Sequence, residues 1–366
     1  MHNSFVASII VYLYSMKKST FCIGLMSGTS LDGLDICYVR FGSDDSFEIL
    51  QTETIDYSLE FKNKLKNAYS VSSMELCELD IQFGYFLGDQ VSYFMKKYQI
   101  NNVDFVSSHG QTIFHQPHKN FTLQIGNGAA IASRCNQKVI CDFRTQDVVL
   151  GGQGAPLVPI GDELLFNQYD ACLNLGGFSN ISMNRNGRRI AFDVCPVNIV
   201  FNFYANQLGF DFDKNGELAA KGKVNKDLVQ ELNQLSFYKE NIPKSLGFEW
   251  VENQFLTIVE KYNITLQDKL NSCLHHIVEQ LIDCFRIYDI NNVLITGGGA
   301  KNKLLINLLQ QNTSTKILIP EVNLIDFKEA LIFAFLGYRR NNNQINCLSS
   351  VTGAYKDHSS GIIYCT

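Results

Sequence analysis

The sequence predicts an α/β protein, of two domains or of one large unit with insertions. Strand-like apolar runs and long amphipathic helices alternate along the chain, which is typical of sheets covered by helices. The 366 residues exceed the roughly 150 of one average domain. Hydrophobic residues make up 46% and charged residues 18%, a balance that excludes a disordered chain and supports a sizeable core.

The first half of the chain is predicted to be rich in strands. An apolar run over 21–26 enters the stretch SGTSLDG, and a second run follows over 34–41, which predicts strand, tight turn and strand. Apolar residues from Leu79 to Phe94 recur at steps of three and four and so predict one long amphipathic helix. Further short strands are expected over 103–107, 122–125 and 139–143.

The second half predicts a similar mixture of strands and helices. The expected elements are strands over 171–175 and 190–194, a helix from Asn198, a long helix over 270–288, and a last unit of strand 293–296, glycine turn 297–299 and helix 302–311. The segment 151–159 is dense in Gly and Pro, which is typical of a connection between two lobes.

The N-terminus carries an apolar run over 5–14 that fits no targeting or membrane segment. It lacks the basic region and cleavage site of a signal peptide, and it is shorter than the about 20 residues needed to cross a bilayer. We interpret 1–15 as an N-terminal extension from an upstream start codon, with Met16 the functional beginning, and expect truncation to Met16 to leave folding and activity intact.

The net charge argues against a nucleic-acid partner, and the cysteine pattern argues against a zinc site. A net charge of −5 lacks the basic excess that nucleic-acid binding requires. The eleven cysteines are scattered, with no CxxC or CxxH pair for zinc, so buried reduced thiols in the cytoplasm are expected.

Three loops place small residues directly after an apolar strand, at 27–33, 176–180 and 297–299. Glycine lets backbone N–H groups approach an anion, and hydroxyls add further donors. Asp32 among these donors could hold Mg²⁺ through water. One such loop is usually a plain turn, but three together predict a phosphate site. No Walker or dinucleotide motif is present, so a different nucleotide fold is expected.

Longer motifs run from residue 24 to residue 354. They are GLMSGTSLDGLD (24–35), SSHGQT (107–112), FTLQIGN (121–127), DFRTQD (142–147), GGQGAPLVP (151–159), LNLGGFSNIS (173–182), FDVCPVN (192–198), GGGAKN (297–302) and VTGA (351–354). With these motifs the chain resembles the anhydro-N-acetylmuramic acid kinases of the actin-like sugar kinase superfamily.

The resemblance implies a two-lobed actin-like ATPase fold with an RNase-H-like core in each lobe, ATP in the cleft and the sugar beside its γ-phosphate. Lobe I is expected to comprise 16–142 with 350–366, and lobe II 143–349. The nucleotide contacts implied are Gly28, Thr29, Ser30, Leu31, Asp32, Gly33, Leu34, Asp35, Gly176, Gly177, Asn180, Gly297, Gly298, Gly299 and Asn302.

The family's substrate is a 1,6-anhydro sugar, whose O6 is tied to C1 and carries no proton. Water must therefore attack C1 while O6 leaves toward the γ-phosphorus, and a carboxylate should activate that water. The family's catalytic aspartate lies in F-D-x-G-P-x-N, which matches 192–198 and makes Asp193 the candidate base. Alternatively, Asp193 caps the helix near Asn198. Cys195 stands where the family usually has Gly, which could alter the backbone or crowd the site.

Polar residues of the matched motifs are candidates for the sugar. They are His109, Gln111, Thr112, Gln124, Asn127, Arg144, Gln153 and Glu329. The fork of Arg144 suits the lactyl carboxylate. His109 could instead be structural, and Glu329 could be a helix cap or a salt-bridge partner. The steps from His109 to His115 and His118 cross Gly and Pro with no fourth ligand, so no metal site is expected there.

The leading hypothesis is an ATP- and Mg²⁺-dependent cytoplasmic kinase. It would convert 1,6-anhydro-N-acetylmuramic acid to N-acetylmuramic acid 6-phosphate in peptidoglycan recycling, and the resemblance suggests a homodimer. The alternatives are a kinase for another anhydro sugar, such as one lacking the lactyl group, and a non-catalytic actin-like nucleotide-binding protein. No nucleic-acid or membrane partner is expected.

Overall fold

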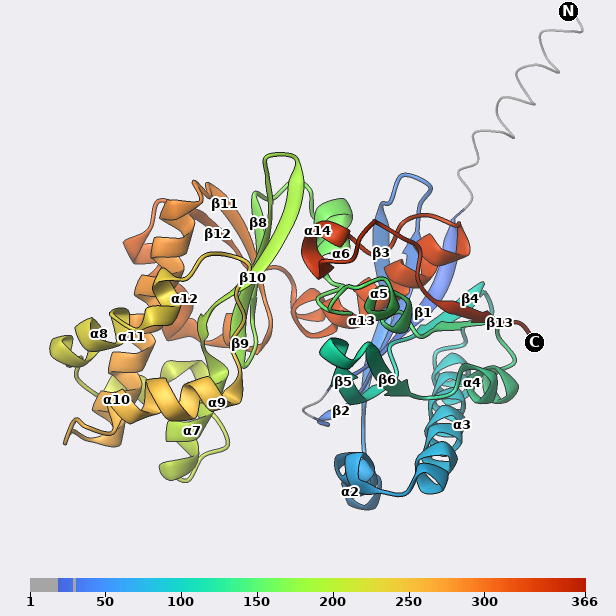
Figure 1. The fold of residues 1–366 in the computed structure, drawn as a ribbon, viewed down its shortest axis with the longest axis horizontal. Coiled ribbons are helices and arrows are strands. Elements are labelled where there is room, and N and C mark those ends of the chain that lie inside the picture. The colour runs from blue at the N-terminus through green and yellow to red at the C-terminus, as the bar shows by residue number, and fades with distance from the viewer. Residues whose placement is uncertain (1–18, 29–30) are drawn as a thin grey trace, which may run out of the picture. The chain divides into compact units, whose positions relative to one another are not determined.

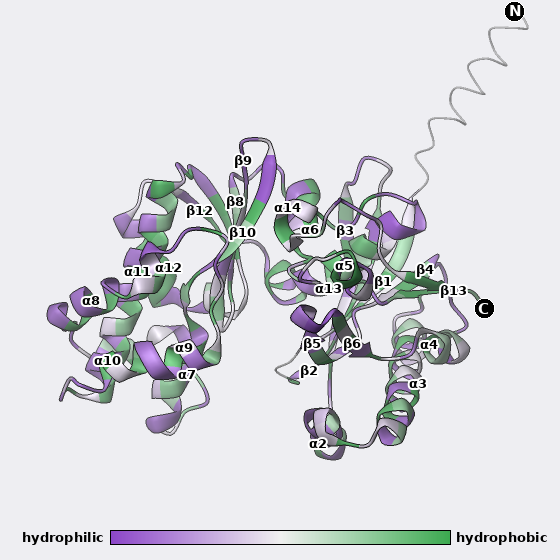
Figure 2. Ribbon diagram, viewed as in Figure 1, coloured by the Kyte–Doolittle hydropathy of each residue, from purple (hydrophilic) through white to green (hydrophobic). Residues whose placement is uncertain are grey.

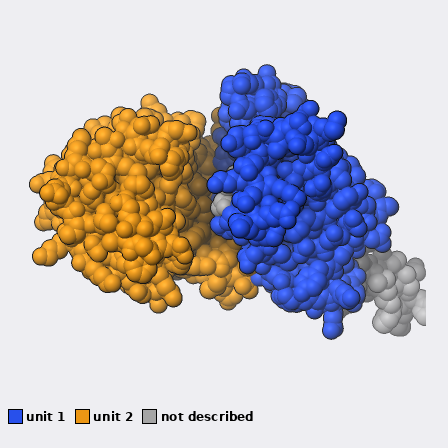
Figure 3. Space-filling model, turned by 90° about the horizontal axis from the view of Figure 1, so that it is seen from below, with its two compact units in different colours: residues 1–165, 329–366 blue, residues 166–328 orange. Residues whose placement is uncertain are grey.

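The computed structural model describes residues 19–28 and 31–366, which divide into two compact units (Figure 1). Unit 1 comprises 1–165 with 329–366 and unit 2 comprises 166–328, as coloured in Figure 3. The predicted extension over 1–15 lies outside the described residues, as do Thr29 and Ser30.

Unit 1 is built on a six-stranded mixed sheet in the order β13-β7-β4-β1-β2-β3. The strands are β1 (Thr20–Ser27), β2 (Gly33–Phe41), β3 (Phe47–Asp56), β4 (Phe105–Ser108), β7 (Val139–Cys141) and β13 (Ile362–Tyr364). β1 to β3 form an antiparallel meander, whereas β4 runs parallel to β1 and β7 parallel to β4. The strands β5 (Gln111–Gln116) and β6 (Phe121–Ile125) form a separate hairpin.

The helices of unit 1 cover this sheet. They are α2 (Leu59–Asn67), α3 (Ser73–Lys97), α4 (Gly128–Cys135), α5 (Thr145–Val149), α6 (Pro159–Leu165), α14 (Ser349–Thr352) and the part of α13 (Val322–Asn341) that begins at Glu329. The long helix predicted around Leu79 to Phe94 is confirmed as α3, whose apolar face is buried and whose start is fixed by a Ser72–Glu75 capping box. Figure 2 shows the mixed hydropathy of its two faces.

Unit 2 repeats the same strand arrangement. Its five-stranded sheet has the order β10-β9-β8-β11-β12, built from β8 (Ala171–Leu175), β9 (Phe178–Arg185), β10 (Arg188–Pro196), β11 (Asn292–Thr296) and β12 (Lys316–Leu318). The first three strands are again an antiparallel meander, and the next two again run parallel to the first. A sheet of order 3-2-1-4-5 with these directions is the RNase-H-like core predicted for each lobe.

The helices of unit 2 bury a large apolar core against this sheet. They are α7 (Asn198–Gln207), α8 (Lys226–Asn233), α9 (Phe248–Trp250), α10 (Thr257–Val259), α11 (Leu266–Ile287) and α12 (Lys303–Asn312), with the first residues of α13. The central helix is α11, whose Leu270, Leu274, Ile277 and Leu281 are all fully buried. The predicted long helix over 270–288 is confirmed, starting one turn earlier.

The unit boundaries differ from the predicted lobe boundaries, because 143–165 and 329–349 fold with unit 1. The physical reason lies in α13. Gly24 on β1 packs so closely on it that a Cβ there would stand 2.1 Å from the carbonyl oxygen of Ala330, and the Ser107 hydroxyl donates to the carbonyl of Phe333. A glycine inside a strand marks such a close approach, which the lobe prediction did not use. No helix of the described chain is long and apolar enough to cross a membrane.

Candidate active site

β1 and β2 pair as an antiparallel hairpin, as the sequence predicts, and the described residues Gly28 and Leu31 to Gly33 lie between its paired strands. Ser27 pairs with Leu34, and the Leu31 N–H donates to the Gly28 carbonyl over 3.1 Å. Asp32 is exposed in this turn. Asp35, already on β2, accepts the Thr54 hydroxyl at 2.6 Å. The turn therefore presents an acidic side chain and a glycine-containing backbone, and its predicted nucleotide contacts remain predictions.

The base of this hairpin is tied to the SSHGQT motif. The Tyr57 hydroxyl donates to Ser27 Oγ over 2.6 Å, and Ser27 in turn donates to Gln111 Oε1. Gln111 is only 3% exposed, so its side chain supports the hairpin from within unit 1. Because β1 and β4 are parallel, with Leu25 beside Ser108, the turn and His109 leave the sheet at the same end. Ligands of mixed α/β sheets bind at such carboxyl ends of parallel strands.

The two glycine loops of unit 2 also leave one sheet end together, because β8 and β11 are parallel and Asn174 pairs with Thr296. Gly297 has φ 82° and ψ 167°, a conformation essentially restricted to glycine. A Cβ there would stand 2.5 Å from Asn174 Oδ1 and 2.9 Å from the Leu175 carbonyl oxygen. The second loop therefore needs glycine for both conformation and space.

The backbone of these two loops is open. Gly177 and Gly298 are exposed, and a Cβ at Gly177 would meet no atom within 4 Å. Asn198 borders both loops, since its Nδ2 donates to the Leu175 carbonyl at 3.0 Å and lies 3.5 Å from a Cβ built on Gly298. Uncovered backbone of this kind is suited to a bound anion.

The other two residues predicted to bind nucleotide in unit 2 differ in exposure. Asn302 is buried and its side chain caps α12, accepting the Leu305 N–H at 3.1 Å. Asn180 on β9 is exposed. The cap gives Asn302 a structural role whether or not it also contacts a nucleotide.

Asp193 lies on β10 opposite Asn180, near the strand end that carries the glycine loops. Its backbone N–H donates to the Lys244 carbonyl at 3.0 Å, and its Oδ2 accepts the Leu246 N–H at 2.8 Å. Burial raises the pKa of this carboxyl, and the Leu246 N–H opposes that shift. The alternative of a helix cap is wrong, because α7 begins after Val197 with no side-chain cap.

Cys195 follows an irregularity in β10, because the β9–β10 register shifts between Asp193 and Cys195. It is fully buried in the core of unit 2, where its thiol lies 3.2 Å from Ser179 Oγ. Its backbone is not among the positive-φ positions, so a side chain is tolerated there. Burial raises the pKa of the thiol to about 12, which keeps it protonated. The departure from glycine is thus absorbed by packing.

His109 is buried and fully engaged. Its Nδ1 lies 2.8 Å from the Gly110 carbonyl oxygen, and its Nε2 accepts the Arg144 Nε–H at 3.1 Å. Burial, assisted by the charge of Arg144, lowers the pKa of His109 to about 3. The neutral ring therefore holds Arg144 in place across the physiological range, and neither ring nitrogen is left to bind a sugar.

Arg144 is fixed at two of its nitrogens. Besides the bond to His109, its Nη1 donates to the Gly154 carbonyl at 2.7 Å, and its guanidinium lies 5.9 Å from the Phe333 ring centre. Burial lowers the pKa of Arg144, and the carboxylate of Glu329 opposes that shift. Glu329 is exposed while the α13 residues that follow it are mostly buried. The structure thus groups these predicted sugar residues around one oriented guanidinium.

Gln124 and Thr112 face each other across the β5–β6 hairpin. The Gln124 amide donates to Thr112 Oγ1 at 3.3 Å and to Thr122 Oγ1 at 2.8 Å, while its Oε1 is buried with no hydrogen-bond partner. His115 Nδ1 lies 3.1 Å from the same Thr122 oxygen. Burial and the charge of Arg144 lower the pKa of His115. This polar strip therefore lies close enough to Arg144 to feel its charge.

Asn127 and Gln153 behave differently from this group. Asn127 caps α4 by accepting the N–H groups of Ala129 and Ala130, and its amide donates to Asp80 at 3.3 Å. Gln153 is exposed, and its backbone N–H donates to the Thr352 carbonyl. Asn127 has a structural task already, whereas the side chain of Gln153 is accessible.

Several residues that shape these loops were not found from the sequence. Leu246 and Lys244 bind Asp193 through backbone atoms, and Asp80 accepts the Gly126 N–H at 2.7 Å from a position far along the chain. Backbone donors and acceptors carry no residue-type signal, so only the structure reveals them. His115 did carry a signal, as a polar residue beside the matched motif, but it was considered only as a metal ligand.

Comparison with known proteins decides the family. A family model described as anhydro-N-acetylmuramic acid kinase matches residues 20–366. The chain belongs to this family. Proteins named anhydro-N-acetylmuramic acid kinase from Sulfurimonas denitrificans and Haemophilus influenzae are 31% and 34% identical to it. The alignments cover 94% and 95% of this chain and 100% and 98% of those relatives.

Solved structures with a similar chain trace are much more distant in sequence. Component A of (R)-2-hydroxyglutaryl-CoA dehydratase from Acidaminococcus fermentans aligns with a TM-score of 0.47 at 12% identity, over 88% of this chain and 99% of that one. A ROK family glucokinase from Streptomyces griseus, in complex with glucose and AMPPNP, aligns with a TM-score of 0.41 at 10% identity, over 86% and 98%.

Family membership confirms the predicted enzyme class, a kinase and therefore a phosphotransferase. The predicted fold is confirmed as well: an α/β, actin-like ATPase fold with an RNase-H-like core in each unit.

Proposed function

We propose that this kinase hydrolyses the 1,6-anhydro bond of anhydro-N-acetylmuramic acid and phosphorylates O6 in the same turnover. The balanced reaction joins the anhydro sugar, ATP and water to give N-acetylmuramic acid 6-phosphate and ADP. Water supplies the new hydroxyl on C1, and O6 accepts the γ-phosphoryl group. The family match over 20–366 supports the substrate class, since the relatives carry this substrate in their names.

The observation that carries the mechanism is the carboxylate of Asp193. The Leu246 N–H occupies Oδ2, which leaves Oδ1 to take the proton of the attacking water. Partial burial raises the pKa of this carboxyl, so its ionised form is a stronger base than an exposed aspartate. We assign Asp193 the role of general base on these grounds.

We assign the phosphates of ATP to the SGTSLDG turn, with Gly28, Leu31 to Asp35 and the undescribed Thr29 and Ser30, and to the glycine loops of unit 2. The exposed backbone of Gly177 and Gly298 supports the assignment to the glycine loops, and the exposed Asp32 supports the assignment to the turn. Asp32, exposed in its turn, fits the single carboxylate that a hydrated Mg²⁺ takes from protein. Bound Mg²⁺ would neutralise charge on the phosphates during transfer.

We assign the lactyl carboxylate of the sugar to Arg144. Its Nε and one Nη1–H are used within unit 1, and its Nη2 makes no hydrogen bond to the described residues, so this edge of the fork is open to a carboxylate. Gln124, Thr112, Gln153 and Glu329 are proposed to contact the sugar hydroxyls and the N-acetyl group. We assign His109 a supporting role, because both of its ring nitrogens are already bonded, and Gln111 a supporting role through the Oε1 that accepts the Ser27 hydroxyl.

The location proposed is the reducing cytoplasm. All eleven cysteines are free thiols in the structure and nine of them are buried. Such thiols behave as small apolar residues where disulfides do not form.

The experiment that tests the function is ADP release from ATP and Mg²⁺ with a panel of anhydro sugars. We expect release with 1,6-anhydro-N-acetylmuramic acid, a smaller value with 1,6-anhydro-N-acetylglucosamine, which lacks the lactyl group, and almost none without sugar. Equal rates with both sugars would reject the role of Arg144. Equal rates with and without sugar would reject the kinase reaction.

A further inference from the structure

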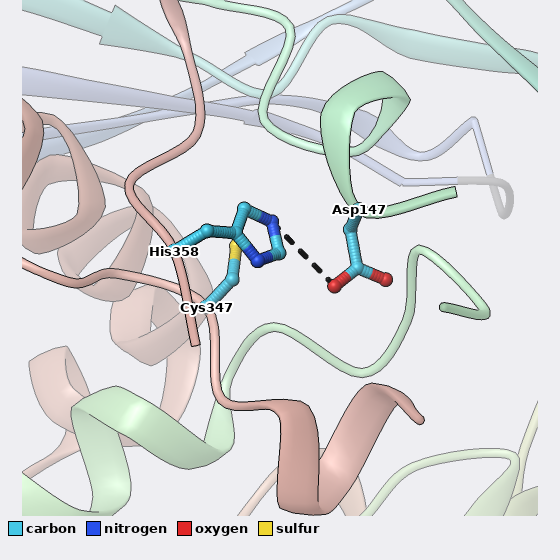
Figure 4. A group of neighbouring side chains, drawn as sticks. All are labelled: Asp147, Cys347 and His358. Atoms are coloured by element: carbon cyan, nitrogen blue, oxygen red, sulfur yellow. Dashed lines mark ion pairs between the residues drawn. The ribbon is translucent and has the colours of Figure 1, made fainter. Parts of the chain in front are cut away.

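A compact cluster of three donor residues lies in unit 1 close to Arg144, and none of the three has been assigned to ATP or sugar. Asp147, Cys347 and His358 each direct one donor atom inward, and these atoms all lie within 4.8 Å of one another (Figure 4). The residues are 0%, 1% and 6% exposed. Burying a carboxylate, a thiol and an imidazole together costs free energy unless each group has a partner, so we ask what this cluster binds.

The chain brings two of the donors together by backbone pairing. Cys347 and His358 form an isolated antiparallel bridge, in which the Cys347 N–H donates to the His358 carbonyl at 3.1 Å and the His358 N–H donates back at 3.2 Å. Directly opposed residues of an antiparallel pair point to the same side. Asp147 arrives from α5, so the cluster connects the C-terminal segment to that helix.

Outer hydrogen bonds orient all three side chains, since the Cys347 thiol faces the Phe143 carbonyl oxygen at 4.0 Å. His358 Nδ1 lies 3.2 Å from the Lys356 carbonyl oxygen, so Nε2 is the ring nitrogen that faces the cluster. Asp147 Oδ1 accepts the Thr352 hydroxyl at 2.7 Å, and Oδ2 accepts the Gly154 N–H at 2.7 Å. A histidine bonded to a carbonyl through its second nitrogen, beside a hydrogen-bonded carboxylate, is the usual outer environment of metal ligands.

The inner atom of His358 has no hydrogen-bond partner. Its Nε2 is buried and lies 3.6 Å from Asp147 Oδ1. The hydroxyls of the next two residues, Ser359 and Ser360, are also buried without a hydrogen-bond partner in the described chain. A lone pair that faces a carboxylate oxygen at this distance is unfavourable unless a cation or a proton lies between them.

We infer that Asp147, Cys347 and His358 bind a zinc ion. A carboxylate, a thiolate and a neutral imidazole together balance the charge of Zn²⁺, which makes the complex neutral and suited to a buried place. Ligand atoms about 2.0 to 2.3 Å from a tetrahedral zinc stand roughly 3.3 to 3.6 Å apart. The 3.6 Å between His358 Nε2 and Asp147 Oδ1 is close to this spacing. The three donor atoms lie within 4.8 Å of one another, so Cys347 Sγ would have to move slightly toward the other two to bind the ion. A water completes the fourth position.

The ion would act as a structural clamp. The Asp147 carbonyl accepts the Gly152 N–H at 2.9 Å and its carboxylate accepts the Gly154 N–H, so Asp147 shapes the GGQGAP loop. The Gly154 carbonyl in turn holds Arg144. Metal binding would therefore stiffen the loop behind that guanidinium. The inference concerns metal affinity alone and holds whichever sugar the enzyme uses.

The test is direct titration of the full-length protein with ZnCl₂ in competition with a chromogenic chelator. The protein carries no histidine tag, and Cys77→Ser and Cys365→Ser are included because these two thiols are exposed. We expect one zinc per chain, a higher melting temperature with zinc, and a thiolate-to-metal absorption band when Co²⁺ replaces it. No zinc binding by this folded protein would overturn the inference.

Variants then locate the ion. Cys347→Ser should abolish the Co²⁺ thiolate band, and His358→Gln should weaken zinc binding at least 10-fold, the usual effect of losing a ligand or its support. Cys284→Ser and His276→Gln are matched controls, because both residues are buried in α11 of the other unit. Unchanged zinc affinity in both cluster variants would overturn the assignment, even if the chain binds one zinc.

Discussion

Replacing Asp193 by Asn removes the proposed base while keeping its shape. The Asn side-chain oxygen can still accept the Leu246 N–H that Asp193 Oδ2 accepts at 2.8 Å, so the loop around the carboxylate should stay in place. The variant loses only the ability to take a proton from water. Because burial raises the pKa of Asp193, the carboxylate is less stabilised in the fold than in water, and a neutral amide should leave the melting temperature equal or higher at neutral pH.

The expected loss of activity follows from general-base catalysis. Such assistance contributes about 10²- to 10⁴-fold, which corresponds to roughly 2.7 to 5.5 kcal/mol of barrier. We therefore expect kcat for the anhydro sugar to fall by that factor, while the Kd for ATP changes less than about threefold. In the wild-type enzyme kcat should fall as pH drops through the pKa of Asp193, above the ordinary aspartate value of about 3.9, since only the ionised form accepts a proton.

The assay is a coupled measurement of ADP release under saturating sugar, with ATP affinity measured by calorimetry. Asp170→Asn is the matched control, because Asp170 also accepts backbone N–H groups but lies at the opposite end of β8 from the glycine loop. We expect the control to keep kcat. If Asp193→Asn retained kcat within about threefold, Asp193 would not be the base, and Glu329 would become the next carboxylate to test.

Three further substitutions probe the surrounding structure. Gly297→Ala should raise the KM for ATP at least tenfold and should destabilise unit 2 by more than Gly187→Ala does. Gly187 is the control because it also has a positive φ, but a Cβ there would have no atom within 4 Å. Equal effects of the two substitutions would exclude the steric argument. His109→Phe removes the ring nitrogen that accepts the Arg144 Nε–H, so kcat/KM for the lactyl-bearing sugar should fall about 10- to 100-fold. The loss should be smaller for the sugar without the lactyl group, and equal losses would exclude this positioning role. Asn127→Ala should cost about 1 kcal/mol of stability by removing the α4 cap, measured by urea unfolding, and keep KM for the sugar; a tenfold rise in KM would restore it as a sugar contact.

Helices and hairpins were predictable where apolar residues recur at a regular spacing or where small residues mark a turn. The α3 helix, the β1–β2 hairpin and the glycine turn after β11 all follow from residue spacing and from small residues at strand ends. The RNase-H-like cores followed from the resemblance, and both sheets contain the 3-2-1-4-5 strand order of such a core. The unit boundaries differ from the predicted lobe boundaries, and the part of α13 from Glu329 packs its backbone on Gly24, a long-range contact without a local signature.

The candidate site was predictable by residue type but not by role. Arg144 and His109 were both expected at the sugar, yet the structure joins them to each other and turns His109 into a support. Which side chains are already occupied depends on partners distant in sequence, such as Gln111 with Ser27. Asp147 lies inside a matched motif, but Cys347 and His358 come close to it only through a backbone bridge near the C-terminus.

The most direct test of the proposed reaction is the fate of oxygen from ¹⁸O-labelled water during one turnover with 1,6-anhydro-N-acetylmuramic acid and ATP. If ring opening and phosphoryl transfer are joined, the product carries ¹⁸O at C1 and unlabelled phosphate on O6, read by mass spectrometry and ³¹P spectroscopy. The exchange of the C1 hydroxyl with solvent is controlled by quenching early and by incubating unlabelled product in labelled water. Label in inorganic phosphate, with the anhydro sugar intact, would mean simple ATP hydrolysis and would contradict the proposed mechanism.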